Sequence, residues 1–511
     1  MMDPGHRGPE QASDIPPAKI VLCCALVFVG AFILYITTLA PTFTWGDSAD
    51  LPLRVFDPSE AFFHMHQREY RLYRLIGRLF LLLPFGDVAY RINLMTALFG
   101  ALTAGIVCAI VLLRTRSRLA GVTAGAALAV SHTFWLLSVM AEVYTLATFL
   151  QGLALLLLLL WKARPLPLYL VVAAFLGGLT ISHHLAGLLF IPPFVLFLIL
   201  ERSRLSFGLL LATLISFSFG SGVFIETAIH IVRGSGPGAL ARFLAAGGPP
   251  GSAMETLHEA ITALAYLCYQ FPAGFVLGCF GIIQLARRPS SWDALVLTLW
   301  LVTFGWAIAD RVPDKYNAYV LSYPLFSVFV GAGVAGLWKA LPITTRRPRL
   351  VLALVTALTI LPVLVYALTP AITKKIGRDI VHARRCPFRD NAWYFLFPPK
   401  AGYAGARRYA DAALVAVDSS AVILADYSLW RPLVYLQRVE GRRPDVAIVF
   451  VQPLCQGDSV VRCLEGWTER RPTYLATDEP AEYYCLDRIR TRFRLSPVPP
   501  VFRVIPDGSR R

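Results

Sequence analysis

The chain has 511 residues, of which 56% are hydrophobic and only 16% charged. Its mean hydropathy of +0.59 lies above the range of soluble globular domains, so these values exclude that class and predict a membrane protein. The formal net charge of +16 does not indicate nucleic-acid binding, because the arginines form no basic stripe interleaved with aromatic residues.

The chain begins with a polar segment that is followed by an apolar one. Residues 1–19 are predicted to be a disordered cytoplasmic tail, since this segment is rich in Pro, Gly and Asp. Residues 20–40 could be an uncleaved signal, but no small-residue cleavage site precedes Pro41, so we interpret them as the first transmembrane helix. Apolar stretches of similar length recur, and we expect about eleven transmembrane helices in a domain of residues 20–370.

Clusters of Lys and Arg occur in alternate loops between the apolar stretches. Short cytoplasmic loops carry an excess of these residues, so we expect every cluster, and the N-terminus, on the cytoplasmic side. The outer loop near Asp310 carries Arg311 and Lys315, an exception that five cytoplasmic clusters outweigh. These clusters are Arg114, Arg116 and Arg118; Lys162 and Arg164; Arg202 and Arg204; Arg287 and Arg288; and Arg346, Arg347 and Arg349.

Two aspartates stand in the first outer loop, residues 41–89. Asp47 and Asp50 are three residues apart, so both carboxylates lie on one side if a helix begins here. The neighbouring Phe43 and Trp45 provide an apolar surface, which can raise the basicity of a carboxylate until it accepts a proton from an attacking hydroxyl. The alternative is that one aspartate caps the helix.

A row of arginines follows in the same loop. Their spacings of three, three and four residues would place them in a cationic stripe if this segment is helical, and they are Arg68, Arg71, Arg74 and Arg78. An amphipathic helix of this kind could simply lie on the membrane surface. Guanidinium groups also match phosphate oxygens in geometry, so the second interpretation is a phosphate-binding site.

Further polar residues are predicted at the outer ends of the transmembrane helices. Each one could cap a helix, but several ionisable groups on one face of a membrane bundle indicate a site for chemistry. His183 and His184 point about 100° apart on a helix, which makes them a poor metal pair, so we expect hydrogen bonds to substrate or phosphate, or helix capping. The residues at these outer ends are His64, His66, Glu142, His183, His184, Asp310 and Asp314.

Residues 371–511 are less hydrophobic and predict a small α/β domain outside the membrane. A helix is expected at residues 403–417, a strand at 421–426, a helix at 432–439 and a strand at 446–451. Four cysteines in this domain could form two disulfides in an oxidising compartment, with three possible pairings. They are Cys386, Cys455, Cys463 and Cys485.

Several segments carry a family resemblance. Residues 47–51 resemble a DSGEL motif in which Asp50 replaces the usual glutamate, and residues 66–73 resemble an HPPGYPLY segment. Residues 142–146, 178–184 and 435–446 resemble later patterns of the same proteins. These are the membrane O-mannosyltransferases of the transmembrane protein 260 type and their bacterial relatives, within the GT-C glycosyltransferase class. The sequence departs from the family at Gln67, Arg68 and Glu69, which replace Pro-Pro-Gly.

The resemblance implies a helical polytopic membrane protein of the GT-C type, with the C-terminal α/β domain outside. It implies transfer of a hexose, mannose in this family, from a polyprenyl-phosphate carrier to a protein or glycan hydroxyl, typically on Ser or Thr. Asp47 would be the base of an inverting displacement, with Asp50 beside it. Candidates to hold lipid phosphate or acceptor are His64, His66, Arg68, Tyr70, Arg71, Arg78, Glu142, Tyr144, His183, His184 and Asp314.

The resemblance also implies where the protein acts and with what. We expect a multi-pass protein of a bacterial inner membrane or an equivalent of the endoplasmic reticulum, with its active site outside the cytoplasm. Membrane lipids, the lipid-linked sugar and the acceptor are the expected partners, without nucleic acid; no cofactor is assigned, and a divalent metal is left open. A transporter is the alternative, but its site would lie near the midplane between internal repeats, and the sequence contains no such repeat. A noncatalytic receptor is a third interpretation.

Overall fold

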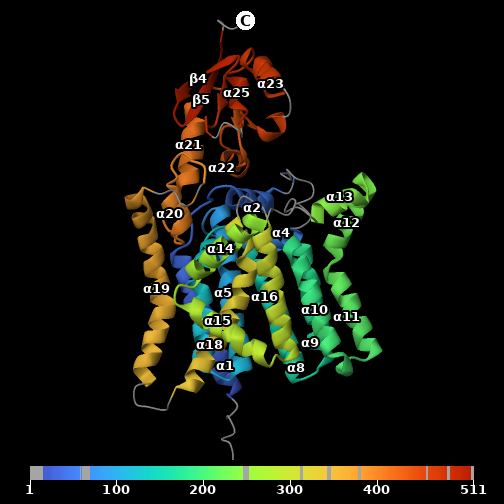
Figure 1. Ribbon diagram of the computed structural model, residues 1–511. Coiled ribbons are helices and arrows are strands. Elements are labelled where there is room, and N and C mark those ends of the chain that lie inside the picture. Colours follow the sequence, from blue (N-terminus) through green and yellow to red (C-terminus); the bar gives the residue numbers. More distant parts are fainter. Residues whose placement is uncertain are drawn as a thin grey trace, which may run out of the picture. The chain divides into compact units, whose positions relative to one another are not determined.

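The computed structural model describes residues 15–57, 59, 70–244, 253–310, 315–341, 347–377, 381, 383–455, 459–479 and 484–507. Contacts divide the chain into two compact units, whose elements are labelled in Figure 1. We call the first the helical unit; it comprises residues 1–32, 101–131 and 147–362. The second, called the mixed unit here, comprises residues 33–100, 132–146 and 363–511. The predicted domain boundaries after residues 19 and 370 stay predictions.

Long apolar helices make up most of the chain. Within the described residues, six segments are long and apolar enough to cross a membrane, and nine if each strongly bent helix pair is one span. The six are α1 (Pro17–Thr37), α5 (Val88–Thr115), α8 (Tyr144–Ala163), α16 (Ser291–Ala309), the run of α17 (Lys315–Ala318), η3 (Val320–Ser322) and α18 (Tyr323–Ala340), and α19 (Arg347–Ile376). The α-helical architecture is confirmed, and the number eleven stays a prediction.

The remaining apolar helices are bent pairs or shorter segments. The bent pairs are α6 (Arg118–Ala129) with α7 (His132–Ser138), α11 (Phe207–Gly220) with α12 (Gly222–Ser235), and α14 (Ala253–Gln270) with α15 (Gly274–Arg287). The shorter segments are α9 (Pro167–His183), η1 (Leu185–Phe190) and α10 (Ile191–Leu200), while η2 (Arg202–Arg204) and α13 (Pro237–Leu244) lie in connections.

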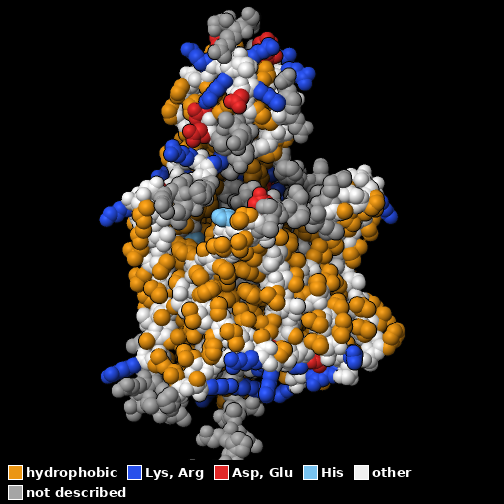
Figure 2. All heavy atoms as spheres, viewed as in Figure 1, with side chains coloured by type: hydrophobic (Ala, Val, Ile, Leu, Met, Phe, Trp, Pro, Cys, Tyr) orange, Lys and Arg blue, Asp and Glu red, His pale blue; other side chains and the backbone are white. Residues whose placement is uncertain are grey.

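The outer surface of these helices is apolar. Figure 2 shows hydrophobic side chains covering the helices of the helical unit. On α11, for example, Phe207 is 82% exposed and Phe219 79% exposed. Water would penalise such a surface, whereas lipid acyl chains accept it. The protein is therefore an integral membrane protein.

Charged residues gather at one end of the helical unit. Arg114 forms a bidentate pair with the buried carboxylate of Asp293, at 2.9 and 2.6 Å. Lys162 Nζ lies 2.7 Å from Glu201, and Arg204 Nε lies 3.3 Å from the same carboxylate. Lys162 Nζ also donates a 2.6 Å hydrogen bond to Ser291, two residues before Asp293. These contacts bring three of the predicted basic clusters to a common end, and Figure 2 shows Lys and Arg side chains along the lower edge.

Helices α15 and α18 pack unusually closely. A Cβ atom on Gly281 would lie 1.9 Å from the Phe329 carbonyl oxygen, and one on Gly333 would lie 2.0 Å from that of Leu277. Only glycine fits such a distance, as is common where membrane helices cross. Because Gly278 faces Phe326 while Gly281 faces Phe329, the two helices run parallel. Their C-terminal ends therefore lie at the same end of the helical unit.

The mixed unit contains a five-stranded sheet of order β2-β1-β3-β5-β4. Strand β1 pairs in parallel with β2 and β3, whereas β5 pairs antiparallel with β3 and β4. The strands are β1 (Val422–Ala425), β2 (Ala447–Phe450), β3 (Thr473–Leu475), β4 (Phe493–Val498) and β5 (Val501–Pro506). The helices near it are α20 (Asn391–Leu396), α21 (Gly405–Ala416), α22 (Tyr427–Glu440), η4 (Gln452–Cys455), α23 (Ser459–Thr468) and α25 (Leu486–Ile489).

The four elements predicted for the C-terminal region are confirmed as α21, β1, α22 and β2, and the α/β character with them. Helix α22 begins five residues before the predicted position. Strands β3 to β5 and helix α23 were not predicted.

The first loop and the sheet share one hydrophobic core. Phe43 and Trp45 belong to the same buried cluster as Tyr409 and Tyr435. The rings of Phe43 and Tyr435 lie 4.5 Å apart, and the Trp45 indole donates a hydrogen bond of 2.6 Å to the hydroxyl of Tyr403. The aspartate segment is thus held by packing against residues near the end of the chain.

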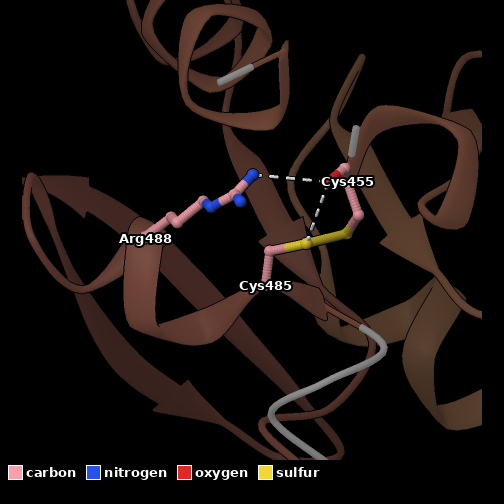
Figure 3. The surroundings of a disulfide bond; sticks show 3 residues. All are labelled: Cys455, Cys485 and Arg488. Atoms are coloured by element: carbon pink, nitrogen blue, oxygen red, sulfur yellow. Dashed lines mark hydrogen bonds between the residues drawn. A yellow bond between two sulfur atoms is a disulfide. The ribbon is translucent and has the colours of Figure 1, made fainter. Parts of the chain in front are cut away.

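One disulfide joins two of the four C-terminal cysteines. Cys455 and Cys485 are bonded, and the guanidinium of Arg488 donates a hydrogen bond of 3.4 Å to the Cys455 carbonyl (Figure 3). Cys386 and Cys463 are free thiols. Of the two disulfides that four cysteines could form, the structure therefore contains one.

Candidate functional site

The site is built around helix α2 (Asp47–Phe56), which begins at the first of the two aspartates. A helix does begin here, which was the condition for the two carboxylates to lie on one side, but the N-cap residue is Gly46 and not an aspartate. Gly46 has φ +62° and ψ −125°, a conformation that glycine adopts without a steric penalty. The sharp turn places Asp47 and Asp50 in the first turn, where the helix dipole favours negative charge.

Asp50 is buried and neutralised by two arginines. Its side chain lies 2.7 Å from Nε of Arg54 and 2.8 Å from Nε of Arg431. The Asp50 residue is only 2% exposed and the Arg431 side chain is fully buried. This geometry suits a structural or positioning role.

Asp47 is the exposed member of the pair. Tyr427 on α22 connects the two acids. Its hydroxyl donates a hydrogen bond of 2.6 Å to Oδ1 of Asp47 and lies 3.2 Å from Oδ2 of Asp50. Burial and the two carboxylates raise the pKa of Tyr427 well above its ordinary value. The phenol therefore keeps its proton at physiological pH and acts as a donor to Asp47.

A buried network fixes the start of α22. Asp426 caps the helix by accepting from the backbone N–H of Ser428 at 3.0 Å. The other carboxylate oxygen lies 2.7 Å from a guanidinium nitrogen of Arg384 and accepts a 2.5 Å hydrogen bond from Tyr484. Because Tyr427 follows directly, this network sets the position of its hydroxyl, and Arg431 follows one turn later.

The arginine stripe lies on helix α4 (Arg71–Phe80), which packs against α2. The segment is helical from Arg71 onward, as the stripe requires. Arg71 and Arg78 are exposed and Arg74 is partly buried. Burial, followed by the charges of Arg78, Arg54 and Arg71, lowers the pKa of Arg74. Arg74 thus lies near three other guanidiniums, of which Arg54 is paired with Asp50.

Glu142 belongs to the same unit and is 7% exposed. It lies within electrostatic range of two tyrosines, Tyr73 and Tyr394. Burial is the main cause that raises the pKa of both phenols, to about 12 for Tyr394, and Glu142 adds to it. Asp47 also acts on Tyr73. The first-loop carboxylate and Glu142 therefore influence one buried phenol.

Other predicted residues lie elsewhere or outside the described residues. His183 is fully buried at the end of α9. Nδ1 of His184 accepts a 3.2 Å hydrogen bond from the Ala186 N–H, so His184 caps the helix η1, which was the alternative interpretation. Both histidines belong to the helical unit. Tyr70 precedes α4, and Tyr144 begins α8. The predicted residues outside the described ranges are His64, His66, Arg68 and Asp314.

Sequence reasoning did not identify Arg54, Tyr427 and Arg431 as site residues. Tyr427 stands 380 residues after Asp47, and no local pattern joins the two segments. The signal that was available is the spacing of Tyr427 and Arg431, four residues apart on one helix face. Among the described residues, no group of three or more His, Cys, Asp or Glu side chains could hold a metal ion.

Comparisons with known proteins agree with the family resemblance. Residues 61–206 match the family described as the N-terminal domain of the protein O-mannosyl-transferase TMEM260. Protein O-mannosyl-transferase TMEM260 from mouse (Mus musculus) is 30% identical over 202 residues, which are 38% of this chain and 28% of the mouse protein. The match thus spans less than a third of that relative's length.

Two solved structures resemble the whole chain. ArnT from Cupriavidus metallidurans bound to undecaprenyl phosphate has a TM-score of 0.56 and 13% identity, over 96% of this chain and 98% of ArnT. The oligosaccharyltransferase AglB from Archaeoglobus fulgidus, in complex with an inhibitory peptide and a dolichol-phosphate, has a TM-score of 0.50 and 13% identity, over 96% of this chain and 74% of AglB. At such identities the likeness concerns the fold, and it confirms the GT-C fold.

Proposed function

Because residues 61–206 belong to the TMEM260 N-terminal domain family and the chain has the GT-C fold, we propose that it is a membrane glycosyltransferase. The donor is a hexose, mannose by analogy with the mouse relative's name, on a polyprenyl-phosphate carrier. The structures of ArnT and AglB, determined with undecaprenyl phosphate and with dolichol-phosphate, support a carrier of this class. The acceptor is a hydroxyl group, on Ser or Thr of a protein.

The observation that carries the mechanism is the difference between the two first-loop aspartates. Asp50 is buried between two guanidiniums, whereas Asp47 is exposed and accepts a 2.6 Å hydrogen bond from Tyr427. Asp47 is therefore the base. It takes the proton of the acceptor hydroxyl while the oxygen forms a bond to the anomeric carbon. The bond from that carbon to the phosphate oxygen breaks, the lipid phosphate leaves with the electron pair, and the configuration inverts.

The arginines of α4 bind the departing phosphate in this proposal. Arg71, Arg74 and Arg78 form a cationic face, and the lowered pKa of Arg74 reflects its burial and the repulsion within that face. A phosphate would relieve this repulsion and gain charge-assisted hydrogen bonds. Candidate binding residues outside the described ranges, or in the helical unit, remain proposals from the resemblance. They are His64, His66, Arg68, His183, His184 and Asp314.

The orientation in the membrane is part of the proposal. The end of the helical unit that carries Arg114, Lys162 and Arg204 faces the cytoplasm, since short basic loops are retained there. The site and the C-terminal sheet lie on the opposite side of the membrane. The disulfide between Cys455 and Cys485 supports this side for the sheet, because disulfides persist in oxidising compartments.

The test is turnover of a defined donor by the purified full-length protein in liposomes. A polyprenyl-phosphate mannose donor and a Ser- and Thr-containing peptide should yield mannosylated peptide and free polyprenyl phosphate in equal amounts. Asp47→Asn removes the base and should abolish both products, a loss on the order of a thousandfold or more.

Asp57→Asn is the matched control. Asp57 lies at the end of the same helix, and its carboxylate accepts a hydrogen bond from the Ser59 hydroxyl rather than taking part in the contacts of Asp47 and Asp50. It should turn over at the parent rate. Retained turnover in Asp47→Asn would contradict the assignment of the base. A parent enzyme that uses a glucose donor and rejects the mannose donor would contradict the sugar.

A further inference from the structure

A cavity of about 180 Å³ opens at the basic end of the helical unit, and none of its lining residues is assigned to the transfer reaction. It lies where α5, α15 and α18 end. Its polar lining consists of Arg114, Thr115, Gln284, Arg288 and Lys339, and the remaining lining is mostly aliphatic. Three of these five side chains are cationic.

The cavity carries an excess of positive charge. Arg114 is neutralised by Asp293 through two hydrogen bonds. Arg288 and Lys339 are exposed, and neither forms an ion pair with any residue that the structure describes. Two cations therefore face one cavity without a carboxylate of their own. An anion with several oxygens matches this arrangement, since Arg, Lys and Gln side chains all donate hydrogen bonds, whereas the Thr115 hydroxyl already donates to the Val111 carbonyl.

The close packing of α15 and α18 shapes the cavity. The glycine contacts described above bring the C-terminal ends of these helices together, so that Arg288 and Lys339 reach the same space. At Gly336 the missing side chain leaves room for Gln284, because a Cβ there would lie 1.7 Å from Nε2 of Gln284. The cavity thus depends on shape as well as charge.

An exposed apolar stripe leads along α15 to the cavity. Val276, Phe280 and Ile283 stand on successive turns and are 72%, 38% and 51% exposed. In a membrane this stripe contacts acyl chains, and it ends beside Gln284. We propose that the cavity binds the phosphate of an anionic membrane lipid whose acyl chains lie along α15. Basic cavities between transmembrane helices bind anionic headgroups in this way.

Native mass spectrometry of the full-length protein in micelles tests the proposal. The parent protein should retain phosphatidylglycerol in preference to phosphatidylcholine. The double variant Arg288→Gln/Lys339→Gln should retain it roughly twenty-five-fold less, since each cation near the headgroup contributes about 1 kcal/mol, or about fivefold. Arg287→Gln is the matched control, because this exposed neighbour does not line the cavity, and it should retain lipid as the parent does.

A second variant separates shape from charge. Gly336→Val keeps every charge but forces the carboxamide of Gln284 into the cavity, so it should also lose the lipid. Thermal unfolding of each variant in the same micelles shows whether it is folded. Parent-like retention in both variants would overturn the proposal. Inorganic phosphate that binds the parent as tightly as phosphatidylglycerol does would overturn the lipid as the ligand. None of these measurements depends on glycosyl transfer.

Discussion

The hydroxyl of Tyr427 donates a 2.6 Å hydrogen bond to Oδ1 of Asp47, across 380 residues of sequence. The same hydroxyl lies 3.2 Å from Asp50, which two arginines neutralise. The exposed acid is therefore oriented by a phenol on helix α22, and that helix is anchored by the buried network around Asp426. The C-terminal part of the chain thus helps to build the site in the first loop.

The first prediction concerns this hydrogen bond. Tyr427→Phe keeps the ring packing and removes the donor to Asp47. Without this contact the carboxylate of Asp47 is no longer held in one orientation, and because misplacing a catalytic group can cost about a hundredfold, we expect kcat to fall by roughly tenfold to a hundredfold. The anionic form of Asp47 also loses stabilisation, so the acid limb of the pH–rate profile should move to higher pH.

The pH profile is the decisive measurement, because a purely structural role of Tyr427 would lower activity without moving the acid limb. Tyr474→Phe is the matched control, since this tyrosine donates to Asp418 at the sheet and not to the acid pair. It should leave the profile in place. An acid limb that stays where it is in Tyr427→Phe would contradict the orienting role of this phenol.

The second prediction concerns the buried pair of Asp50 and Arg431. Asp50→Ala leaves a fully buried guanidinium without this carboxylate, which typically costs about 3–5 kcal/mol. The thermal midpoint of the purified protein should fall clearly. Adding Arg431→Met should recover part of the loss, because the double variant no longer buries that charge. If the double variant is less stable than Asp50→Ala, the pair is not the source of the loss.

The local structure around the acids could be predicted because its causes lie close together in sequence. The spacings of the two aspartates and of the arginines gave the face that each set would share if a helix formed, and α2 and α4 are such helices. Helix α22 was predicted to begin near Pro432, five residues too late. The structure has Pro432 inside the helix, and the capping side chain of Asp426 begins it earlier.

The different roles of the two acids could not be predicted. Nothing in the first loop shows that Asp50 meets Arg431 or that Asp47 meets Tyr427, because only the tertiary packing of α2 against α22 creates these contacts. The hydrophobic core of the mixed unit could not be predicted either, because it also depends on tertiary packing. The rings of Trp45 and Tyr409 lie 5.8 Å apart in this core, although most of the membrane helices lie between these two residues in the sequence.

The third prediction concerns a buried lysine. Lys400 is 1% exposed, and its Nζ donates to the carbonyls of Phe397 and Pro398 at 2.6 and 3.2 Å. Burial lowers the pKa of Lys400 to about 7. Between pH of about 7 and 10, the unfolded chain binds this proton and the folded chain does not, so the free energy of unfolding contributed by Lys400 rises with pH.

Lys400→Met removes this dependence and the two hydrogen bonds. Relative to the parent, the variant should be most stable near pH 7, where the parent buries a charged lysine. Its stability relative to the parent should then decrease steadily toward pH 10. Thermal midpoints of both proteins, measured in the same detergent across this range, provide the difference. Parallel pH dependences of the two proteins would show that Lys400 is not the group that titrates.

The last prediction concerns the disulfide between Cys455 and Cys485. It closes a loop with a sequence separation of 30, and the chain-entropy relation assigns such a loop about 3.5 kcal/mol of stabilisation. Cys455→Ser should therefore lower the thermal midpoint, whereas Cys463→Ser should not, because Cys463 is a free thiol. Peptide mapping of unreduced protein from cells should find Cys455 joined to Cys485, with Cys386 and Cys463 alkylated after denaturation. Because a cytoplasmic domain would be kept reduced, recovery of Cys455 as a free thiol would place the sheet on the other side of the membrane from the one proposed.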